Sequence, residues 1–284
     1  VTSKGGRCYA DSEGSTPDAS PLLTSWLDEE YEVHGVIGSG GFGTVRLARC
    51  RDSGKLCAVK SICKDTFSSR ETALREADIL RLFNHRGVNR LIETVEDEWH
   101  VHLVVDYVQG SDLLSEMMNL GRTEEQRAAQ ITQQVLAALA HCHEQGIVHR
   151  DIKPENIVVQ NRDSRPSITL VDFGLAAATG DCLDRTEGTL PYLAPEVLES
   201  SCGDRVDTPQ DLWSVGIVLY AMLSGKLPTD TADRREDELD LSSIQASDEA
   251  KDLLAELLRR DPRERPSACE ALEHPWLAKC SVAA

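Results

Sequence analysis

The hydrophobic pattern of this chain changes its period near Gln109-Gly110-Ser111, and that change restricts the folds open to it. Before this point, apolar residues from Tyr31 onward follow two-residue steps between glycine-containing turns, which is typical of antiparallel strands. The one helix predicted there spans residues 69–83. After this point, apolar residues recur at helical spacing in segments such as residues 212–223. The sequence therefore predicts an α+β fold in which a small antiparallel sheet precedes a mainly helical part.

The domain organisation follows from this change. The N-terminal residues are rich in Ser, Gly, Asp and Thr and lack apolar periodicity, so residues 1–29 are predicted to form a flexible extension. We assign residues 30–108 to a first lobe and residues 109–284 to a second lobe. In the second lobe, the capping-box pattern predicts helices that start near Thr123, with Gln126, and near Ser267, with Glu270.

Composition excludes several classes of protein. The formal charge of −18 argues against nucleic acid and membrane surfaces as partners, and is compatible with basic protein substrates. Nine cysteines are scattered singly without a Cys-x-x-Cys pair, which predicts free thiols in a reducing compartment. The N-terminus has no secretory pattern and residues 212–223 are too short to span a membrane, so an intracellular, cytoplasmic location is expected. The sequence leaves the oligomeric state open, with a monomer as the default.

A glycine-rich segment from Gly38 to Val45 places backbone without Cβ atoms where a ligand can come close. Dinucleotide-binding loops also use spaced glycines, but they join a strand to a helix. Here strand-like alternation follows the glycines, so the segment is predicted to join two strands. Strand alternation then places Ala58 and Lys60 on one face, and Glu76 shares a helix face with Leu80. An ion pair between Lys60 and Glu76 would hold the lysine toward phosphate oxygens.

Two later segments carry the most specific signal: residues 149–156, with the sequence His-Arg-Asp-Ile-Lys-Pro-Glu-Asn, and residues 172–174, Asp-Phe-Gly. With the segments at 194–196 and 211–216, and with Arg265 ahead of 274–276, they resemble the signature set of the eukaryotic protein kinase family. The resemblance covers about residues 31–277. The Lys-Pro-Glu-Asn form of the loop is similar to the serine/threonine type, and residues 75–80 and 274–276 look most like the calcium/calmodulin-dependent kinase group.

The resemblance implies the two-lobed kinase fold, with a five-stranded antiparallel N-lobe that carries one main helix and a mainly helical C-lobe. It implies a protein serine/threonine kinase that transfers the γ-phosphoryl group of ATP, with Mg²⁺, to protein hydroxyls. The implied catalytic residues are Asp151, Lys153, Lys60 and Glu76, and the implied metal ligands are Asn156 and Asp172. The implied ATP-binding residues are Gly38, Ser39, Gly40, Gly41, Phe42, Gly43, Val45, Ala58, Lys60, Val105, Asp106, Val108, Asp112, Glu155 and Val158.

Further roles come from the same resemblance. Phe173, His149, Leu80 and Leu91 match a stacked apolar spine, and Glu196 with Arg265 matches a structural ion pair. Asp112 and Glu155 match positions that face an upstream basic residue of the substrate. Thr186 is the predicted activating phosphorylation site, opposite Arg150, although Glu187 is an alternative source of negative charge.

The chain departs from the family pattern in one region, and two alternatives to a protein kinase remain. Residues 226–247 are short and acidic where relatives carry a full docking helix. A pseudokinase scaffold typically loses the Lys or an Asp that this chain keeps as Lys60, Asp151 and Asp172. A nucleotide-binding enzyme that acts on a small molecule would more often lack the peptide-groove segments at 188–189 and 194–196.

Overall fold

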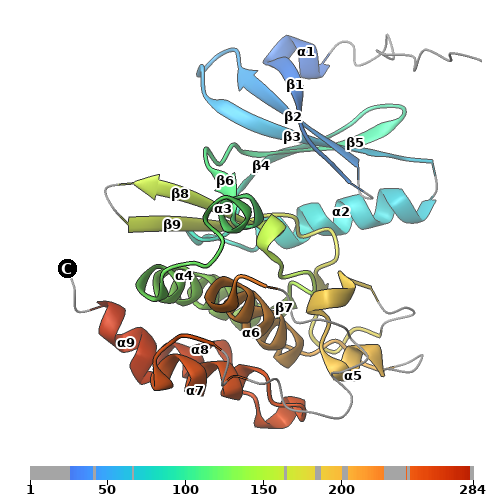
Figure 1. Cartoon of the computed structure of the whole chain (residues 1–284). Helices are drawn as coiled ribbons and strands as arrows, with labels where there is room; N and C mark the ends of the chain where they lie inside the picture. The colour runs from blue at the N-terminus through green and yellow to red at the C-terminus, as the bar shows by residue number, and fades with distance from the viewer. Residues whose placement is uncertain are drawn as a thin grey trace, which may run out of the picture.

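The computed structural model describes residues 26–40, 43–65, 67–162, 165–182, 187–199, 204–226, 241 and 244–281. Figure 1 shows a twisted sheet at one end of the molecule and a bundle of helices at the other. This arrangement confirms the predicted α+β fold with a β-rich N-terminal part and a helical C-terminal part. No helix of the described residues is long and apolar enough to span a membrane.

The N-terminal sheet has five antiparallel strands in the order β1-β2-β3-β5-β4. Its strands are β1 (Tyr31–Gly40), β2 (Gly43–Cys50), β3 (Leu56–Cys63), β4 (Leu91–Glu96) and β5 (His100–Asp106). The main helix, α2 (Phe67–Arg81), lies below the sheet in Figure 1, and its buried residues Ala73, Ala77 and Leu80 pack in the core with Val101 and Leu103 of β5. The predicted five strands and single main helix are therefore confirmed.

The opposite face of the sheet has a small core of its own. Leu27 of helix α1 (Trp26–Glu30) and Tyr31 pack with buried residues of the sheet that include Val59 and Val104. Residues 26–29 belong to the segment for which the composition predicts a flexible extension, but the structure has them in this helix because Leu27 gains a buried position. The rest of that predicted extension, residues 1–25, lies outside the described residues.

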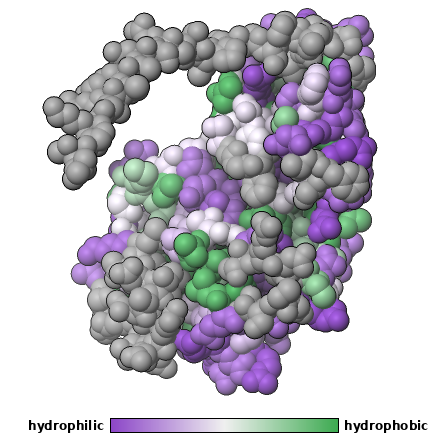
Figure 2. All heavy atoms as spheres, turned by 90° about the vertical axis from the view of Figure 1, so that its right-hand side faces the viewer, coloured by the Kyte–Doolittle hydropathy of each residue, from purple (hydrophilic) through white to green (hydrophobic). Residues whose placement is uncertain are grey.

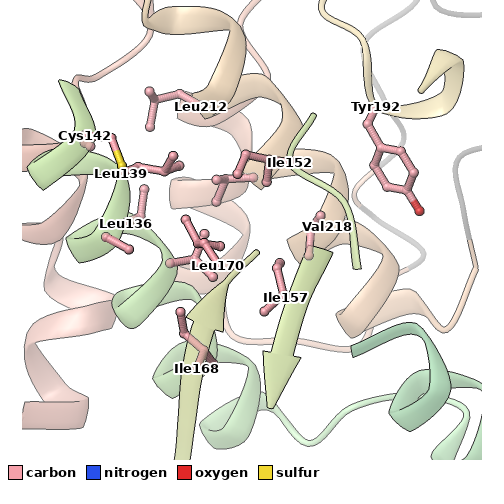
Figure 3. Packing of buried hydrophobic residues seen from close by; sticks show 14 of the residues in the cluster. Leu136, Leu139, Cys142, Ile152, Ile157, Ile168, Leu170, Tyr192, Leu212 and Val218 are labelled. Carbon is pink, nitrogen blue, oxygen red and sulfur yellow. The ribbon is translucent and has the colours of Figure 1, made fainter. Parts of the chain in front are cut away.

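The helical part is built around α4 (Glu125–Glu144) and α6 (Pro209–Ser224). Figure 3 shows Leu136 and Leu139 of α4, Leu212 of α6 and Ile152 converging on one buried cluster. The remaining helices and strands are α3 (Leu113–Leu120), α5 (Pro195–Leu198), α7 (Asp248–Leu257), α8 (Ala268–Leu272), α9 (Pro275–Ser281), β6 (Ser111–Asp112), β7 (Ile147–Val148), β8 (Ile157–Arg162), β9 (Arg165–Leu170) and β10 (Ala177–Ala178).

Of the two predicted capping boxes, one is confirmed and one is wrong. Ser267 caps α8, and its hydroxyl accepts from the backbone N–H of Glu270 while the Glu270 carboxylate accepts from Ser267 N. At the start of α4, Glu124 is the N-cap residue and makes no side-chain capping bond. Thr123 is buried instead, and its backbone N–H donates to Met222 O of α6. The residue before α4 is thus tied to α6 through its backbone, and its side chain does not cap the helix. The predicted shortening within residues 226–247 lies mostly outside the described residues.

Candidate active site

A cavity of about 520 Å³ lies between the sheet and the helical part. Its apolar walls include Val45 and Ala58 from the sheet and Val158 from β8. The predicted site residues that line it are Gly38, Ser39, Gly43, Val45, Ala58, Lys60, Glu76, Val105, Asp106, Val108, Asp112, Glu155, Asn156, Val158 and Asp172. Gly40 lies next to this set at the end of β1, while Gly41 and Phe42 lie outside the described residues. One cavity therefore brings together most of the predicted ATP-binding residues.

The glycine-rich segment joins β1 to β2, as the alternation predicts. Gly43 has a φ of +126°, a conformation that side chains with a Cβ rarely adopt. A Cβ at this position would lie 2.2 Å from the carbonyl oxygen of Ser61 on the neighbouring strand. Only glycine therefore fits where this hairpin crosses the end of β3.

Lys60 is the electrostatic centre of the cavity. Its Nζ donates to Glu76 Oε1 at 2.7 Å and Oε2 at 2.8 Å, and to Asp172 Oδ1 at 2.7 Å. Lys60 comes from β3, Glu76 from α2 and Asp172 from the segment after β9, so one ammonium group joins three parts of the chain. The predicted Lys60–Glu76 ion pair is present, and Asp172 is a second partner.

The pKa values of this cluster follow from burial and mutual attraction. Burial opposes the charged form of Lys60, but the carboxylates of Glu76 and Asp172 outweigh it and raise the pKa of the ammonium. Burial also opposes ionisation of Asp172, yet the neighbouring Lys60 lowers the pKa of this carboxyl group. For Glu76 burial is the stronger effect and its pKa lies above the ordinary value. Lys60 and Asp172 are therefore held as ions at neutral pH.

Asp151 and Lys153 meet beside the cavity. Lys153 Nζ lies 2.6 Å from Asp151 Oδ2, and it donates to the hydroxyl of Thr189 at 2.8 Å. The Thr189 hydroxyl in turn donates to Asp151 Oδ1 at 2.7 Å. Asp151 and Lys153 are thus both tied to the segment that precedes α5. Asp151 is held at both carboxylate oxygens, which fixes the direction in which it can accept a proton.

Asn156 and Asp172 are the residues with oxygen atoms suited to a hard cation. The amide nitrogen of Asn156 donates to Asp151 O at 2.8 Å and to Asp151 Oδ2 at 3.0 Å. This uses the nitrogen of the amide and leaves its oxygen as the group that can bind a metal. Because Asn156 and Asp172 both line the cavity and Asp172 is ionised, the two residues fit a site for Mg²⁺.

The loop that carries Asp151 is strained and is held by one buried carboxylate. Arg150 and Asp172 have φ values of 68° and 61°, which are uncommon outside glycine. Asp211 of α6, fully buried, accepts from His149 N at 2.9 Å and from Arg150 N at 2.8 Å. His143 Nε2 lies 2.9 Å from the same carboxylate. Such strain persists only where surrounding contacts over-determine the backbone, and Asp211 supplies them.

The predicted apolar spine passes next to this loop. The ring of Phe173 lies 4.6 Å from that of His149 and 5.2 Å from that of Phe83 between ring centroids. Leu80 is buried in the same core, and Leu91 packs against it. Gly174 follows Phe173 and is closely surrounded, since a Cβ there would lie 3.3 Å from Lys60 Nζ. The packing of Phe173 therefore sets where Asp172 and the backbone of Gly174 meet Lys60.

The segment before α5 also contacts Arg150, in the loop of residues 149–156. Its guanidinium donates to Leu175 O at 3.0 Å and lies 3.3 Å from Glu187 Oε2. Glu187 thus occupies the place opposite Arg150 for which the sequence predicts either a phosphate or this carboxylate. Thr186 lies outside the described residues. The Glu196–Arg265 pair is also present, with two bonds of 2.6 Å and 2.7 Å between α5 and the segment before α8.

Two contacts of the candidate site residues were not predicted from the sequence. Thr189 appears in the sequence only as part of a peptide-groove segment, and the structure bonds its hydroxyl to both Asp151 and Lys153. Asp211 appears only as the first residue of a family segment, without a role. A lone acidic residue at the start of the strongly apolar helix α6 is the signal that marks it, because an unpaired carboxylate there would be costly to bury.

Comparison with known families matches residues 31–277 to the protein kinase domain. Calcium/calmodulin-dependent protein kinase type 1 of Caenorhabditis briggsae is 37% identical over 273 residues, which cover 91% of this chain and 76% of that protein. Serine/threonine-protein kinase DCLK3 of Mus musculus is 35% identical over 280 residues, covering 93% of this chain and 35% of that protein. Serine/threonine-protein kinase cds1 of Schizosaccharomyces pombe is 38% identical over 288 residues, covering 93% of this chain and 62% of that protein.

The chain spans about a third of the mouse relative and less than two thirds of the fission-yeast one. The family match nevertheless extends from the first residue of β1 into α9, and so includes both the sheet and the helical part. The relatives confirm the predicted similarity to serine/threonine kinases, including the calcium/calmodulin-dependent group. This chain belongs to the protein kinase family, as a catalytic domain of the serine/threonine type.

Proposed function

We propose that this kinase domain uses ATP and Mg²⁺ to phosphorylate serine and threonine hydroxyls that follow an upstream basic residue. The observation that carries the proposal is the cluster in which Lys60 pairs with Glu76 and Asp172 at 2.7–2.8 Å. A cationic group held in this way, at the end of an apolar cavity of nucleotide size, fits the phosphates of ATP while the apolar walls accept its base.

Adenine is proposed to lie between Val45 and Ala58 on one side and Val158 on the other, because these side chains line the apolar part of the cavity. The backbone N–H of Asp106 donates to Arg90 O at 3.0 Å, so the carbonyl of Asp106 and the backbone of Val108 are the groups proposed to bond the adenine edge. Val105 then borders the cavity behind the base, in the gatekeeper position.

Asp172 and Asn156 are the proposed ligands of Mg²⁺, which when bound neutralises developing charge on the phosphates. Phosphoryl transfer depends mainly on positioning and electrostatic stabilisation. Asp151 is proposed to orient the substrate hydroxyl and accept its proton, since both of its oxygens are fixed by neighbours. Lys153, 2.6 Å from Asp151, is proposed to stabilise the transferring phosphoryl group. The other residues of the candidate site are proposed to hold Asp172, Asn156, Asp151 and Lys153 in place.

The preference for a basic residue rests on Asp112 and Glu155, which line the same cavity. Glu155 is exposed at the start of the 3₁₀ turn Pro154–Asn156, and Asp112 caps α3 by accepting from Ser115 N at 2.8 Å. Two carboxylates at one opening favour a guanidinium or ammonium over a neutral side chain. The formal charge of −18 on the chain would add long-range attraction for basic segments.

A peptide series tests this proposal. Serine peptides that carry one arginine moved stepwise through the positions before the serine are compared with an all-alanine parent. We expect one upstream position to raise kcat/KM by about tenfold, as two exposed charge contacts of up to about 1 kcal/mol each allow. The gain should shrink as salt is added, because the carboxylates are screened.

Three variants connect that gain to the named residues. Glu155→Gln and Asp112→Asn should each reduce the advantage of the arginine peptide, and asparagine keeps the cap of α3. Glu273→Gln, at an exposed position beyond α8, is the matched control and should not change it. A series in which acidic or proline-flanked peptides react best, or in which both cavity variants keep the arginine preference, would contradict the proposal.

A further inference from the structure

A cluster of side chains that could bind a metal lies at the turn between β4 and β5. Asp97, His100 and His102 offer one carboxylate oxygen and two imidazole nitrogens, and these ligand atoms all lie within 4.8 Å of one another. His100 and His102 are two residues apart on β5 and therefore project from the same face of the strand. This cluster is separate from the acidic and basic residues of the nucleotide cavity.

The cluster lies on the face of the sheet away from that cavity. His102 is opposite Ser61 in the β3–β5 register, whereas the next pair joins Leu103 to Lys60, which faces the cavity. Adjacent positions on a strand face opposite ways, so His102 and Ser61 point outward from the cleft. Ligands bound there would not compete with nucleotide for the same space.

The distances are close to those of a metal site. His102 Nε2 lies 2.9 Å from Asp97 Oδ2, and His100 Nδ1 lies 3.7 Å from Asp97 Oδ1. Two ligand atoms that bind one tetrahedral zinc ion at about 2.0–2.1 Å lie roughly 3.4 Å apart. The two separations, measured to the two oxygens of the same carboxylate, lie on either side of this value, and one ligand atom from each of the three side chains lies within 4.8 Å of the others.

His102 is prepared for this role by its other ring nitrogen. The side chain is almost fully buried, and Nδ1 lies 2.9 Å from the hydroxyl oxygen of Ser61. Metal-binding histidines usually donate their second N–H to such an oxygen, which fixes the ring and the tautomer. Without an ion, the 2.9 Å separation between Nε2 and Asp97 Oδ2 is that of an Nε2–H···O hydrogen bond. In the tautomer with the proton on Nδ1, which donates to Ser61, Nε2 has the lone pair that binds a metal.

Asp97 is also held in place. Its Oδ1 accepts from the backbone N–H groups of Trp99 at 2.7 Å and His100 at 2.6 Å. The carboxylate thus closes the turn, and its Oδ2 faces His102. His100 takes part in closing the turn through its backbone N–H. Its imidazole is not needed for that bond and lies within reach of the other two ligand atoms.

The charges around His100 come from several elements. His102, Arg46 of β2 and Lys64 lie near its imidazole, as does the carboxylate of Asp97. Lys64 repels a cation, but its ammonium is engaged by Glu96 at 3.1 Å and by Asp97 O. Glu98, exposed in the same turn, adds a negative charge.

We propose that Asp97, His100 and His102 bind a zinc ion on the outer face of the N-terminal sheet. Two imidazoles and a carboxylate suit zinc, while Mg²⁺ prefers sites made of oxygen ligands and water. Three protein ligands leave a fourth position for water or for a side chain of another molecule.

Calorimetric titration of the full chain with Zn²⁺ tests the site, in buffer with excess Mg²⁺ to occupy the oxygen ligands of the cleft. We expect saturable binding, and a weakening of at least about tenfold in both His100→Ala and Asp97→Asn. Asparagine keeps the oxygen that closes the turn, so Asp97→Asn removes the ligand charge with little change to the loop. His34→Ala, at an exposed histidine of β1, is the matched control and should bind like the wild type.

A second measurement needs no variant. Addition of Zn²⁺ should shift the imidazole proton signals of His100 and His102 in the NMR spectrum together, with the same saturation point as the heat signal. Absence of saturable binding would overturn the proposal. Binding that is equally strong in His100→Ala and Asp97→Asn, or that leaves both imidazole signals unmoved, would also overturn it.

Discussion

Lys60 contacts two carboxylates at once, and the two contacts have different consequences. Glu76 fixes the lysine to α2, and Asp172 links it to the proposed metal site. We expect Lys60→Met and Asp172→Asn each to lower kcat on the order of 10²- to 10³-fold, since each removes a preorganised charge. Turnover with saturating ATP measures this, and the thermal unfolding midpoint shows that the fold is retained.

The matched controls for these variants are exposed residues of the turn between β2 and β3. Lys55→Met and Asp52→Asn make the same chemical changes away from the cavity and should leave kcat within about twofold, as surface substitutions usually do. Near-normal turnover in Lys60→Met or Asp172→Asn would show that the cluster does not take part in the reaction.

The buried carboxylate of Asp211 should make the stability of the fold depend on pH. Burial opposes its ionisation, but the bonds from His143 and the backbone of His149 lower its pKa below the ordinary value. In the unfolded chain Asp takes up a proton near pH 3.9. Stability from the carboxylate is therefore fully present above that pH and is lost as the pH falls further, because the unfolded state binds the proton first.

Asp211→Asn should lower the free energy of unfolding by about 3 kcal/mol at pH 7, since it leaves buried donors with weaker partners. Denaturant unfolding of both proteins between pH 7 and pH 3 measures this, and the difference should narrow at the acid end. kcat should fall as well, because Asp211 holds the backbone of Arg150 beside Asp151. A difference that stays constant through the acid range would contradict the account.

Site residues could be predicted from the sequence where each belongs to a recognisable motif. Lys60, Glu76 and Asp172 were predicted in this way, and the structure brings them together. Thr189 and Asp211 were missed because their partners are at least 36 and 61 residues away, respectively. Local periodicity gives no information on such contacts, which exist only after the helical part has packed.

At the scale of elements, the segment before α5 depends on the contact between Arg150 and Glu187. Glu187 places a negative charge opposite Arg150, where the sequence predicts either a phosphate on Thr186 or this carboxylate. We therefore expect Thr186→Ala to keep most of the activity of unphosphorylated protein, and Glu187→Gln to lower kcat several-fold by loosening this segment. Kinase assays on phosphatase-treated protein measure both.

The matched control for these two variants is Glu199→Gln. It changes an exposed carboxylate beyond α5 that pairs with Arg260, and it should leave kcat unchanged. If Thr186→Ala abolished activity and Glu187→Gln did not, activation would require the phosphate, as the first of the two sequence alternatives holds.

Helices and strands were predicted well where the local pattern of their own residues determines them. The strand pattern of β3 and the capping box of α8 are local features, and the structure has both the strand and the cap. The start of α4 is close to the predicted one, but the predicted Thr123 cap is absent: Glu124 is the N-cap residue, and the backbone N–H of Thr123 bonds to Met222 of α6. Likewise, α1 forms because Leu27 packs on a sheet built from later residues, which the composition of the N-terminal segment does not reveal.

At the scale of the whole molecule, the sheet and the helical part contribute different halves of one site. The sheet and α2 supply Lys60 and Glu76, and the helical part supplies Asp151, Asn156 and Asp172. On the face that carries α5 and one end of α2, hydrophilic residues predominate and hydrophobic ones form only small areas (Figure 2). The described residues seen on this face therefore form no large apolar patch.

Both halves are expected to act together in phosphoryl transfer to protein hydroxyls. Incubation with γ-labelled ATP and a generic basic protein, with and without Mg²⁺, measures this transfer, with Asp151→Asn as the paired variant. We expect label on serine and threonine that requires Mg²⁺ and is lost in the variant. Tight ATP binding without any transfer, label on tyrosine alone, or equal labelling by Asp151→Asn would contradict it.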